Sequence, residues 1–156
     1  MQVRHMLQKL NNSHPAVAEA IRNVFQASYA VEAEILKAVD FPPLKRPIEK
    51  YIETDTEFYG YLIGDEIVAV TELRFHPHFI HIQSLVVHPN HFRKGIASQM
   101  MNFILDSFAN YPRFMVETGV DNKPASDLYR KFGFYEIHQW DTDHGVRKIR
   151  FEKIML

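Results

Sequence analysis

A glycine that follows two cations and precedes an apolar helical pattern is the stretch of this sequence best suited to bind an anion. Arg93 and Lys94 come directly before Gly95. The first turn of a helix carries backbone N–H groups without partners, and the helix dipole adds partial positive charge there. Glycine lets a ligand approach the backbone closely, because it has no side chain. The stretch predicts a phosphate or pyrophosphate site, although an ordinary loop can show the same pattern.

Two elements must position this turn. Residues 82–87 are apolar and β-branched and end before Pro89, which predicts a strand. After the glycine the apolar period changes from strand-like to helical, which predicts a helix. The apolar positions of that helix are Ile96, Met100, Phe103, Ile104 and Phe108.

Two motifs of this chain resemble those of the GCN5-related N-acetyltransferases, the GNAT family. Residues 86–97 read Val-Val-His-Pro-Asn-His-Phe-Arg-Lys-Gly-Ile-Ala, which is similar to that family's acetyl-CoA-binding motif. Residues 122–134 match its later signature, Asn-x-x-Ala-x-x-Leu-Tyr-x-x-x-Gly-Phe. The motifs stand in the expected order, and the resemblance covers Ile67 to Phe134. Phe92 departs from the pattern, because the family usually has Gln or Arg there.

The resemblance implies acetyl-CoA as co-substrate and a particular set of residues around it. Backbone groups at the strand end pair with the pantetheine arm in such proteins, and amides of the basic turn hold the pyrophosphate. The implied cofactor-binding residues are Leu85, Val86, Val87, Arg93, Lys94, Gly95, Ile96, Ala97, Ser98, Asn122 and Ser126. With Phe92 in place of Gln or Arg, a polar side-chain contact to the pyrophosphate is not expected at that position.

Tyr129 is the candidate acid, since it matches the tyrosine of the second motif. A phenol with a pKa near 10 is protonated at neutral pH and can donate to a leaving thiolate. The alternative is that Tyr129 belongs to the apolar stripe of its helix, and a tyrosine can serve both purposes.

The general base is less clearly marked. Counting back from the glycine, His81 falls where several members of the resembled family carry a catalytic glutamate, and a neutral imidazole can accept a proton. Glu72 is the second candidate, with His76 and His78 nearby, and a water chain without a single base is a further possibility. A metal site is not expected, since His76 and His78 lack a third ligand at convincing spacing.

Composition limits the protein class. The 156 residues suggest one domain over residues 1–156, with a net charge of −1 that gives no general attraction to nucleic acid. There is no cysteine, which excludes disulfides and a cysteine nucleophile. The first residues show no signal peptide, and no apolar run is long enough to span a membrane. We expect a soluble, cytoplasmic protein without membrane or nucleic-acid partners, and a homodimer is possible through strand edges.

The patterns predict an α/β (α+β) fold with a mixed, largely antiparallel sheet and helices on both of its faces. A strand is expected at 3–10 and a helix at 15–38 whose charged positions, Glu19, Arg22, Glu32 and Glu34, form a mostly solvated face. A short helix is expected at 48–53. Further strands are expected at 57–63, 66–75, 79–88, 114–120, 134–140 and 146–155. The strands at 79–88 and 114–120 should be parallel, because a helix crosses between them, and the resemblance implies that they splay apart.

Several aromatic residues could line a pocket for the acceptor. Phe25, Tyr29, Tyr51 and Tyr59 are candidates, but core positions are the preferred interpretation for each of them, as for Trp140. The expected activity is transfer of an acetyl group to an amine of a small or amino-acid-like molecule by direct attack. A peptide or protein amine is the alternative acceptor, and a non-catalytic CoA-binding module is the alternative from another class.

Overall fold

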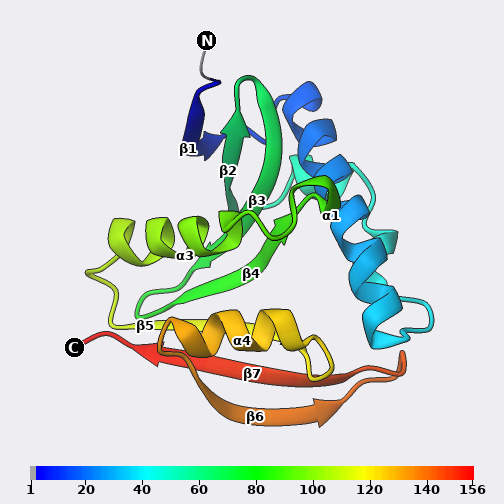
Figure 1. Cartoon of the computed structure of the whole chain (residues 1–156), viewed down its shortest axis with the longest axis vertical. Helices are drawn as coiled ribbons and strands as arrows, with labels where there is room; N and C mark the ends of the chain where they lie inside the picture. The colour runs from blue at the N-terminus through cyan, green and yellow to red at the C-terminus, as the bar shows by residue number, and fades with distance from the viewer. Residues whose placement is uncertain (1–2) are drawn as a thin grey trace.

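The computed structural model describes residues 3–156, which form a sheet covered by helices on both faces (Figure 1). In these residues the sheet has seven strands in the order β1-β2-β3-β4-β5-β7-β6, and β4–β5 is the parallel pair. The strands are β1 His5–Leu10, β2 Glu57–Ile63, β3 Glu66–Phe75, β4 Ile80–Val87, β5 Arg113–Gly119, β6 Tyr135–Asp141 and β7 Arg147–Ile154. This arrangement confirms the expected fold class.

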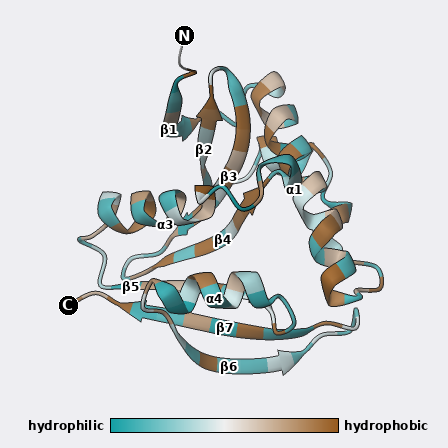
Figure 2. Cartoon of the chain, in the orientation of Figure 1, coloured by the Kyte–Doolittle hydropathy of each residue, from teal (hydrophilic) through white to brown (hydrophobic). Residues whose placement is uncertain are grey.

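The helices divide between the two faces of the sheet. They are α1 Pro15–Leu36, α2 Glu49–Ile52, α3 Ile96–Ser107 and α4 Lys123–Lys131, with single 3₁₀ turns η1 Pro42–Lys45 and η2 Pro89–His91. Helix α1 packs on Phe58, Val70 and Val86 of the central strands. Helices α3 and α4 cover the other face and share a core with β5 and β7. Figure 2 shows apolar residues concentrated along β3 and β4, between these layers.

A β-bulge in β4 changes which face the following side chains address. Glu72 of β3 pairs with Ser84, but the next residue, Leu73, pairs with Ile82, so Gln83 is the additional residue in β4. Ile82 therefore packs in the core beneath α3 and α4, whereas Ser84 points toward α1 and contacts Tyr29. The bulge is what directs the end of β4 toward the α1 side.

The parallel pair β4–β5 separates shortly after it forms. Pairing extends from Ile80–Phe114 to Ile82–Val116, over three residue pairs. Strand β4 nevertheless continues to Val87 and β5 to Gly119. The bulge at Gln83 lies directly after the last pair, and bulges increase strand twist and end pairing. The splayed parallel strands that the family resemblance implies are therefore present.

Most predicted element bounds lie within two residues of the observed ones. Two apolar residues of helices lie elsewhere than their spacing suggests. Phe108 was expected in the helical stripe, but α3 ends at Ser107 and Phe108 is its C-cap. Ile35 lies on α1 one helical turn after Val31, but its side chain is 43% exposed. In residues 3–156 no helix is both long enough and apolar enough to cross a bilayer.

Candidate active site

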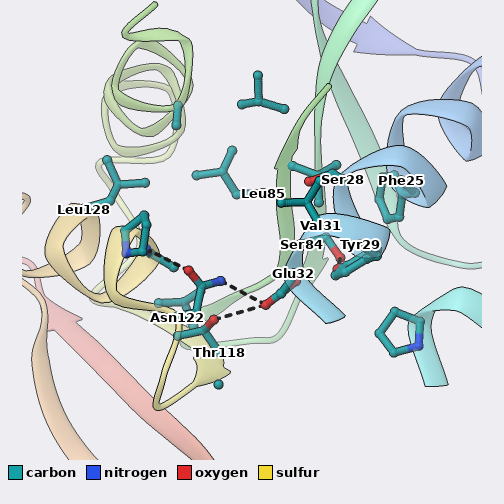
Figure 3. Close-up of a pocket in the computed structure, with 18 of the residues that line it drawn as sticks. Phe25, Ser28, Tyr29, Val31, Glu32, Ser84, Leu85, Thr118, Asn122 and Leu128 are labelled. Carbon is teal, nitrogen blue, oxygen red and sulfur yellow. Dashed lines mark hydrogen bonds between the residues drawn. The ribbon is translucent and has the colours of Figure 1, made fainter. Parts of the chain in front are cut away.

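A cavity of about 740 Å³ opens where β4 and β5 diverge (Figure 3). The end of β4 and the turn before α3 form one side of it, and α1 with η1 forms the other. The end of β5 and the beginning of α4 complete the wall, so the two sequence motifs meet at a single cavity.

The turn before α3 offers backbone donors to this cavity. Gly95 has a φ of 75° and Arg93 a φ of 63°, so both lie in the left-handed region, which is rare for a residue with a side chain. No side chain caps α3, and in residues 3–156 no group outside the helix accepts from the amides of its first turn. A Cβ built on Gly95 would meet no atom within 4 Å. The turn is therefore an open set of N–H groups at a helix N-terminus, suited to an anion.

Most of the predicted cofactor-binding residues line the cavity, and two do not. The lining residues among them are Leu85, Val86, Val87, Arg93, Gly95, Ile96, Ala97, Ser98 and Asn122. Lys94 is exposed and contacts the His91 ring instead. Ser126 is buried in α4. Phe92, the departure from the family pattern, lines the cavity and is 42% exposed.

Tyr129 lies on the cavity wall and is almost completely buried. Its ring packs against Phe134 and Phe151, and in residues 3–156 no hydrogen bond to its hydroxyl is found. Burial, and after it the charge of Glu32, raises the pKa of Tyr129, so the phenol is protonated at neutral pH. The side chain thus belongs to the core and also presents a proton donor to the cavity. Its role as the acid remains a prediction.

Glu72 lines the cavity, but its carboxylate already has partners. Arg46 donates from Nη1 to Oε1 at 2.7 Å and from Nη2 to Oε2 at 3.0 Å, and the Thr56 hydroxyl donates to Oε2 at 2.7 Å. The guanidinium also lies 4.1 Å from the centroid of the Tyr51 ring. Both oxygens of the Glu72 carboxylate are thus already hydrogen-bonded within the protein.

His81 does not line the cavity. It lies on β4 before the bulge, between Arg74 of β3 and Met115 of β5. Burial lowers the pKa of His81, although the charge of Glu117 opposes that shift. His76 stacks on Phe79 with ring centroids 4.2 Å apart, and His78 is exposed. The structure therefore brings Tyr129 and Glu72 to the cavity and leaves the three histidines outside it.

The aromatic candidates separate into different environments. Phe25 and Tyr51 are buried in the core beneath α1, as preferred. They and Tyr29 also line the α1 side of the cavity, and the Tyr29 hydroxyl lies 2.8 Å from Ser84 Oγ. Tyr59 does not line the cavity but packs against Phe103 and Phe108. Trp140 is neither at the cavity nor in a core cluster. It stacks on His138 at the surface of β6, so the core position expected for it is wrong.

Glu32 is the residue that the sequence interpretation missed. It was assigned to a solvated face, but it is half-buried and lines the cavity. It shares the helical spacing of Phe25, Tyr29 and Leu36, so its carboxylate lies on an otherwise apolar helix face. That position could have indicated from the sequence that Glu32 is not on the solvated face. Asn122 Nδ2 donates to Glu32 Oε1 at 3.1 Å, while Asn122 Oδ1 caps α4 by accepting from the Ala125 amide. The side chain of Asn122 thus links α1 to α4.

The end of α1 is also fixed against β5. A Cβ on Gly119 would lie 2.4 Å from Leu36 Cδ2, so Leu36 occupies the space that any side chain there would need. Leu36 comes one helical turn after Glu32, and Thr118 at the end of β5 is 3.4 Å from Glu32 Oε1. These contacts set the distance between α1 and the splayed end of β5.

Comparison with known proteins identifies the family. Residues 18–134 match the model of the acetyltransferase (GNAT) family. The chain belongs to this family. This confirms the resemblance seen in the two motifs and agrees with the expected enzyme class, an acetyltransferase.

Two Bacillus subtilis (strain 168) proteins are related in sequence to this GNAT chain. It is 30% identical to UPF0157 protein YqkA over 90% of the chain, and it is 30% identical to the uncharacterized N-acetyltransferase YsnE over 63% of the chain. The chain spans 41% of the length of the first relative and 68% of the second.

Solved structures share the fold of this GNAT chain at low identity. The ribosomal-protein-S18-alanine N-acetyltransferase of Escherichia coli has a TM-score of 0.78 at 14% identity, covering 97% of this chain and 94% of that one. The PaiA N-acetyltransferase of Thermoplasma acidophilum, solved with coenzyme A, has a TM-score of 0.72 at 17% identity, covering 97% and 99%. At these identities the similarity shows the fold alone.

Proposed function

We propose that this chain is an N-acetyltransferase that moves the acetyl group of acetyl-CoA to the amine of a small or amino-acid-like molecule. The observation that carries the proposal is the meeting of three features at one cavity. The splayed end of β4 offers an unpaired backbone edge, the turn at Gly95 offers free amides, and Tyr129 offers a protonated hydroxyl. A donor with a pyrophosphate, an extended amide arm and a thioester matches the turn, the β4 edge and Tyr129, in that order.

The chemistry follows from that order. The amides of the turn bind the pyrophosphate, and the backbone of Leu85 to Val87 pairs with the pantetheine arm as an additional strand would. The acceptor nitrogen attacks the thioester carbonyl carbon, and the carbon–sulfur bond breaks. The Tyr129 hydroxyl donates its proton to the leaving thiolate. No covalent intermediate on the chain is proposed, because the amine attacks the thioester directly and the chain contains neither a cysteine nor a supported serine triad.

Calorimetry of acetyl-CoA binding, with Gly95→Glu as the test variant, examines the donor site directly. The new carboxylate would project into the space that the pyrophosphate needs and would repel it. We expect wild type to bind and Gly95→Glu to lose binding. Gly145→Glu is the matched control, because Gly145 also has a positive φ, of 81°, and open space around the Cβ that a substitution would add, but lies in the β6–β7 turn.

A panel of small primary amines, offered to the wild type with acetyl-CoA, then tests turnover through release of the free thiol. Turnover of at least one amine supports the proposal. Binding of acetyl-CoA without turnover of any amine or peptide would favour a CoA-binding module instead. Absence of acetyl-CoA binding by folded wild type would contradict the proposed function as a whole.

A further inference from the structure

Three carboxylates line the cavity in the part of the chain that the structure describes, and they differ in their partners. Glu72 pairs with Arg46 at 2.7 Å, and Glu117 pairs with Arg150 at 2.7 Å. Glu32 has no lysine, arginine or histidine nitrogen within 4 Å in residues 3–156. Two of the three carboxylates thus form ion pairs within the described residues, and Glu32 does not.

The hydrogen bonds of Glu32 leave one of its oxygens free. Asn122 Nδ2 and Thr118 Oγ1 both donate to Oε1, at 3.1 and 3.4 Å (Figure 3). No donor within hydrogen-bonding distance of Oε2 is found in residues 3–156. The two donors come from β5 and α4, so the carboxylate is held from the side of the splayed strand. A fixed carboxylate with one unoccupied oxygen is a ready acceptor for a cationic N–H donor.

The cavity wall beside Glu32 is partly apolar. Neighbouring positions of α1 place Val31, Ile35 and Leu36 on the cavity wall, and Phe41 follows from the connection to η1. This lining is suited to an aliphatic or aromatic group.

The titratable groups that face Glu32 come from four elements. They are Tyr29 on α1, Tyr129 on α4, Lys148 on β7 and, through Tyr29, Glu72 on β3. Burial raises the pKa of Glu32, while the Asn122 amide, the Lys148 charge and the Thr118 hydroxyl act in the opposite direction. A raised carboxyl pKa brings the group closer to the range in which it exchanges protons at neutral pH.

We propose that Glu32 binds the ammonium group of the acceptor through Oε2 and takes its proton, and that the acceptor is a primary amine on an apolar body. This inference rests on the proposed function, because it names the acceptor class of that same cavity. It assigns the role of general base to Glu32 and not to the two earlier candidates. His81 lies outside the cavity, and Glu72 is paired with Arg46.

The proton balance of the step is complete with the groups present. The ammonium gives one proton to Glu32, which releases it to solvent, and the neutral nitrogen forms a bond to the carbonyl carbon. The carbon–sulfur bond breaks with its electron pair on sulfur, which takes the Tyr129 proton. The second proton of the attacking nitrogen restores the phenol. The products are the amide, free CoA thiol and one proton.

Binding of an amine to the CoA-loaded protein tests this without requiring turnover. Calorimetry with 2-phenylethylamine on wild type and Glu32→Gln, both saturated with CoA, should show affinity reduced about tenfold to a hundredfold in the variant. The uncharged probe 2-phenylethanol should bind both proteins equally. Glu34→Gln, an exposed position on the same helix, should behave as wild type toward both probes. Equal amine affinity in Glu32→Gln and wild type would overturn the proposal, as would failure of the CoA-loaded wild type to bind the amine.

Turnover separates proton transfer from binding. With saturating 2-phenylethylamine, kcat of Glu32→Gln should fall, whereas an acceptor of low basicity such as phenylhydrazine, which is neutral at pH 7, should be affected much less. An equal loss for both acceptors would overturn the base role. Acetyl-CoA affinity, unchanged in Glu32→Gln, shows that the fold is intact. Loss of acetyl-CoA binding in the wild type would instead contradict the proposed function, so the two failures are distinguishable.

Discussion

The two sides of the cavity are built in different ways. The proposed donor side uses one contiguous segment, in which the end of β4, the turn at Gly95 and the beginning of α3 present mainly backbone groups. The proposed acceptor side uses side chains that the fold brings together from distant positions, such as Tyr29 with Ser84 and Glu32 with Asn122. Backbone recognition tolerates sequence change, and side-chain recognition does not. The acceptor side should therefore determine specificity.

The difference also concerns charge. The proposed donor side has the Arg93 side chain and the amides of the turn before α3, for which no partner is found in the described residues, and this is appropriate for an anionic ligand. The acceptor side contains the buried Arg46–Glu72 pair, which is neutral as a unit, and Glu32, which is not paired. Substitutions on the acceptor side can therefore act on stability, on acceptor binding, or on both, and the following experiments separate these effects.

Tyr129→Phe should have the largest effect, because it removes the proposed proton donor and keeps the ring that packs in the core. We expect kcat to fall about 10²- to 10⁴-fold. The dissociation constant of acetyl-CoA should change less than about twofold, since no hydrogen bond to the hydroxyl is found in residues 3–156. Steady-state kinetics and calorimetry measure the two quantities. A variant that loses donor binding but retains kcat would show that Tyr129 acts structurally.

Glu72→Gln should mainly reduce stability. It leaves the Arg46 guanidinium without its charge partner in a mostly buried place, which costs about 3 kcal/mol of unfolding free energy. Urea unfolding measures the change. Glu57→Gln is the matched control, because Glu57 pairs with Lys9 at the surface and its loss should cost less than about 1 kcal/mol. Similar losses in the two variants would mean that the buried pair contributes no more than a surface pair.

Gly119→Ala should perturb the position of α1. The added methyl group would overlap Leu36, and overpacking of this kind costs about 1–3 kcal/mol. The same shift should raise KM for the amine more than KM for acetyl-CoA, because Glu32 lies one turn before Leu36. The double variant Gly119→Ala/Leu36→Ala should recover part of the lost stability relative to the sum of the single changes. Strict additivity would contradict the steric explanation.

The pH dependence of stability gives the smallest and most specific effect. Burial raises the pKa of Glu32 in the folded state, so its protonated form favours folding and its ionised form opposes it. The stabilisation is complete below the unfolded-state pKa and is lost as pH rises through the folded-state value. Relative to wild type, Glu32→Gln should therefore gain stability between mildly acid and neutral pH. Urea unfolding at several pH values measures the free energy of unfolding of both proteins. A difference between them that does not change with pH would refute the raised pKa.

The donor side was predictable because its features are local. The strand–turn–helix pattern around Gly95 depends on neighbouring residues, and the strands β2 and β3 have the expected bounds. The placement of Glu32 depends on pairing with residues 86 and 90 positions away, which no local pattern encodes. The bulge at Gln83 is similar, because an apolar strand gives no sign of one additional residue until its partner strand is known.

The short β4–β5 pairing has a mechanical consequence. The sheet divides into two halves, β1 to β4 and β5-β7-β6, and three residue pairs join these halves between β4 and β5. Helix α1 packs on the first half and contacts the second through the Glu32–Asn122 hydrogen bond and the packing of Leu36 on Gly119. A ligand between β4 and β5 would fill the opening and contact both halves of the sheet. Because few backbone hydrogen bonds join the two halves there, we expect ligand binding at this opening to reduce their relative motion.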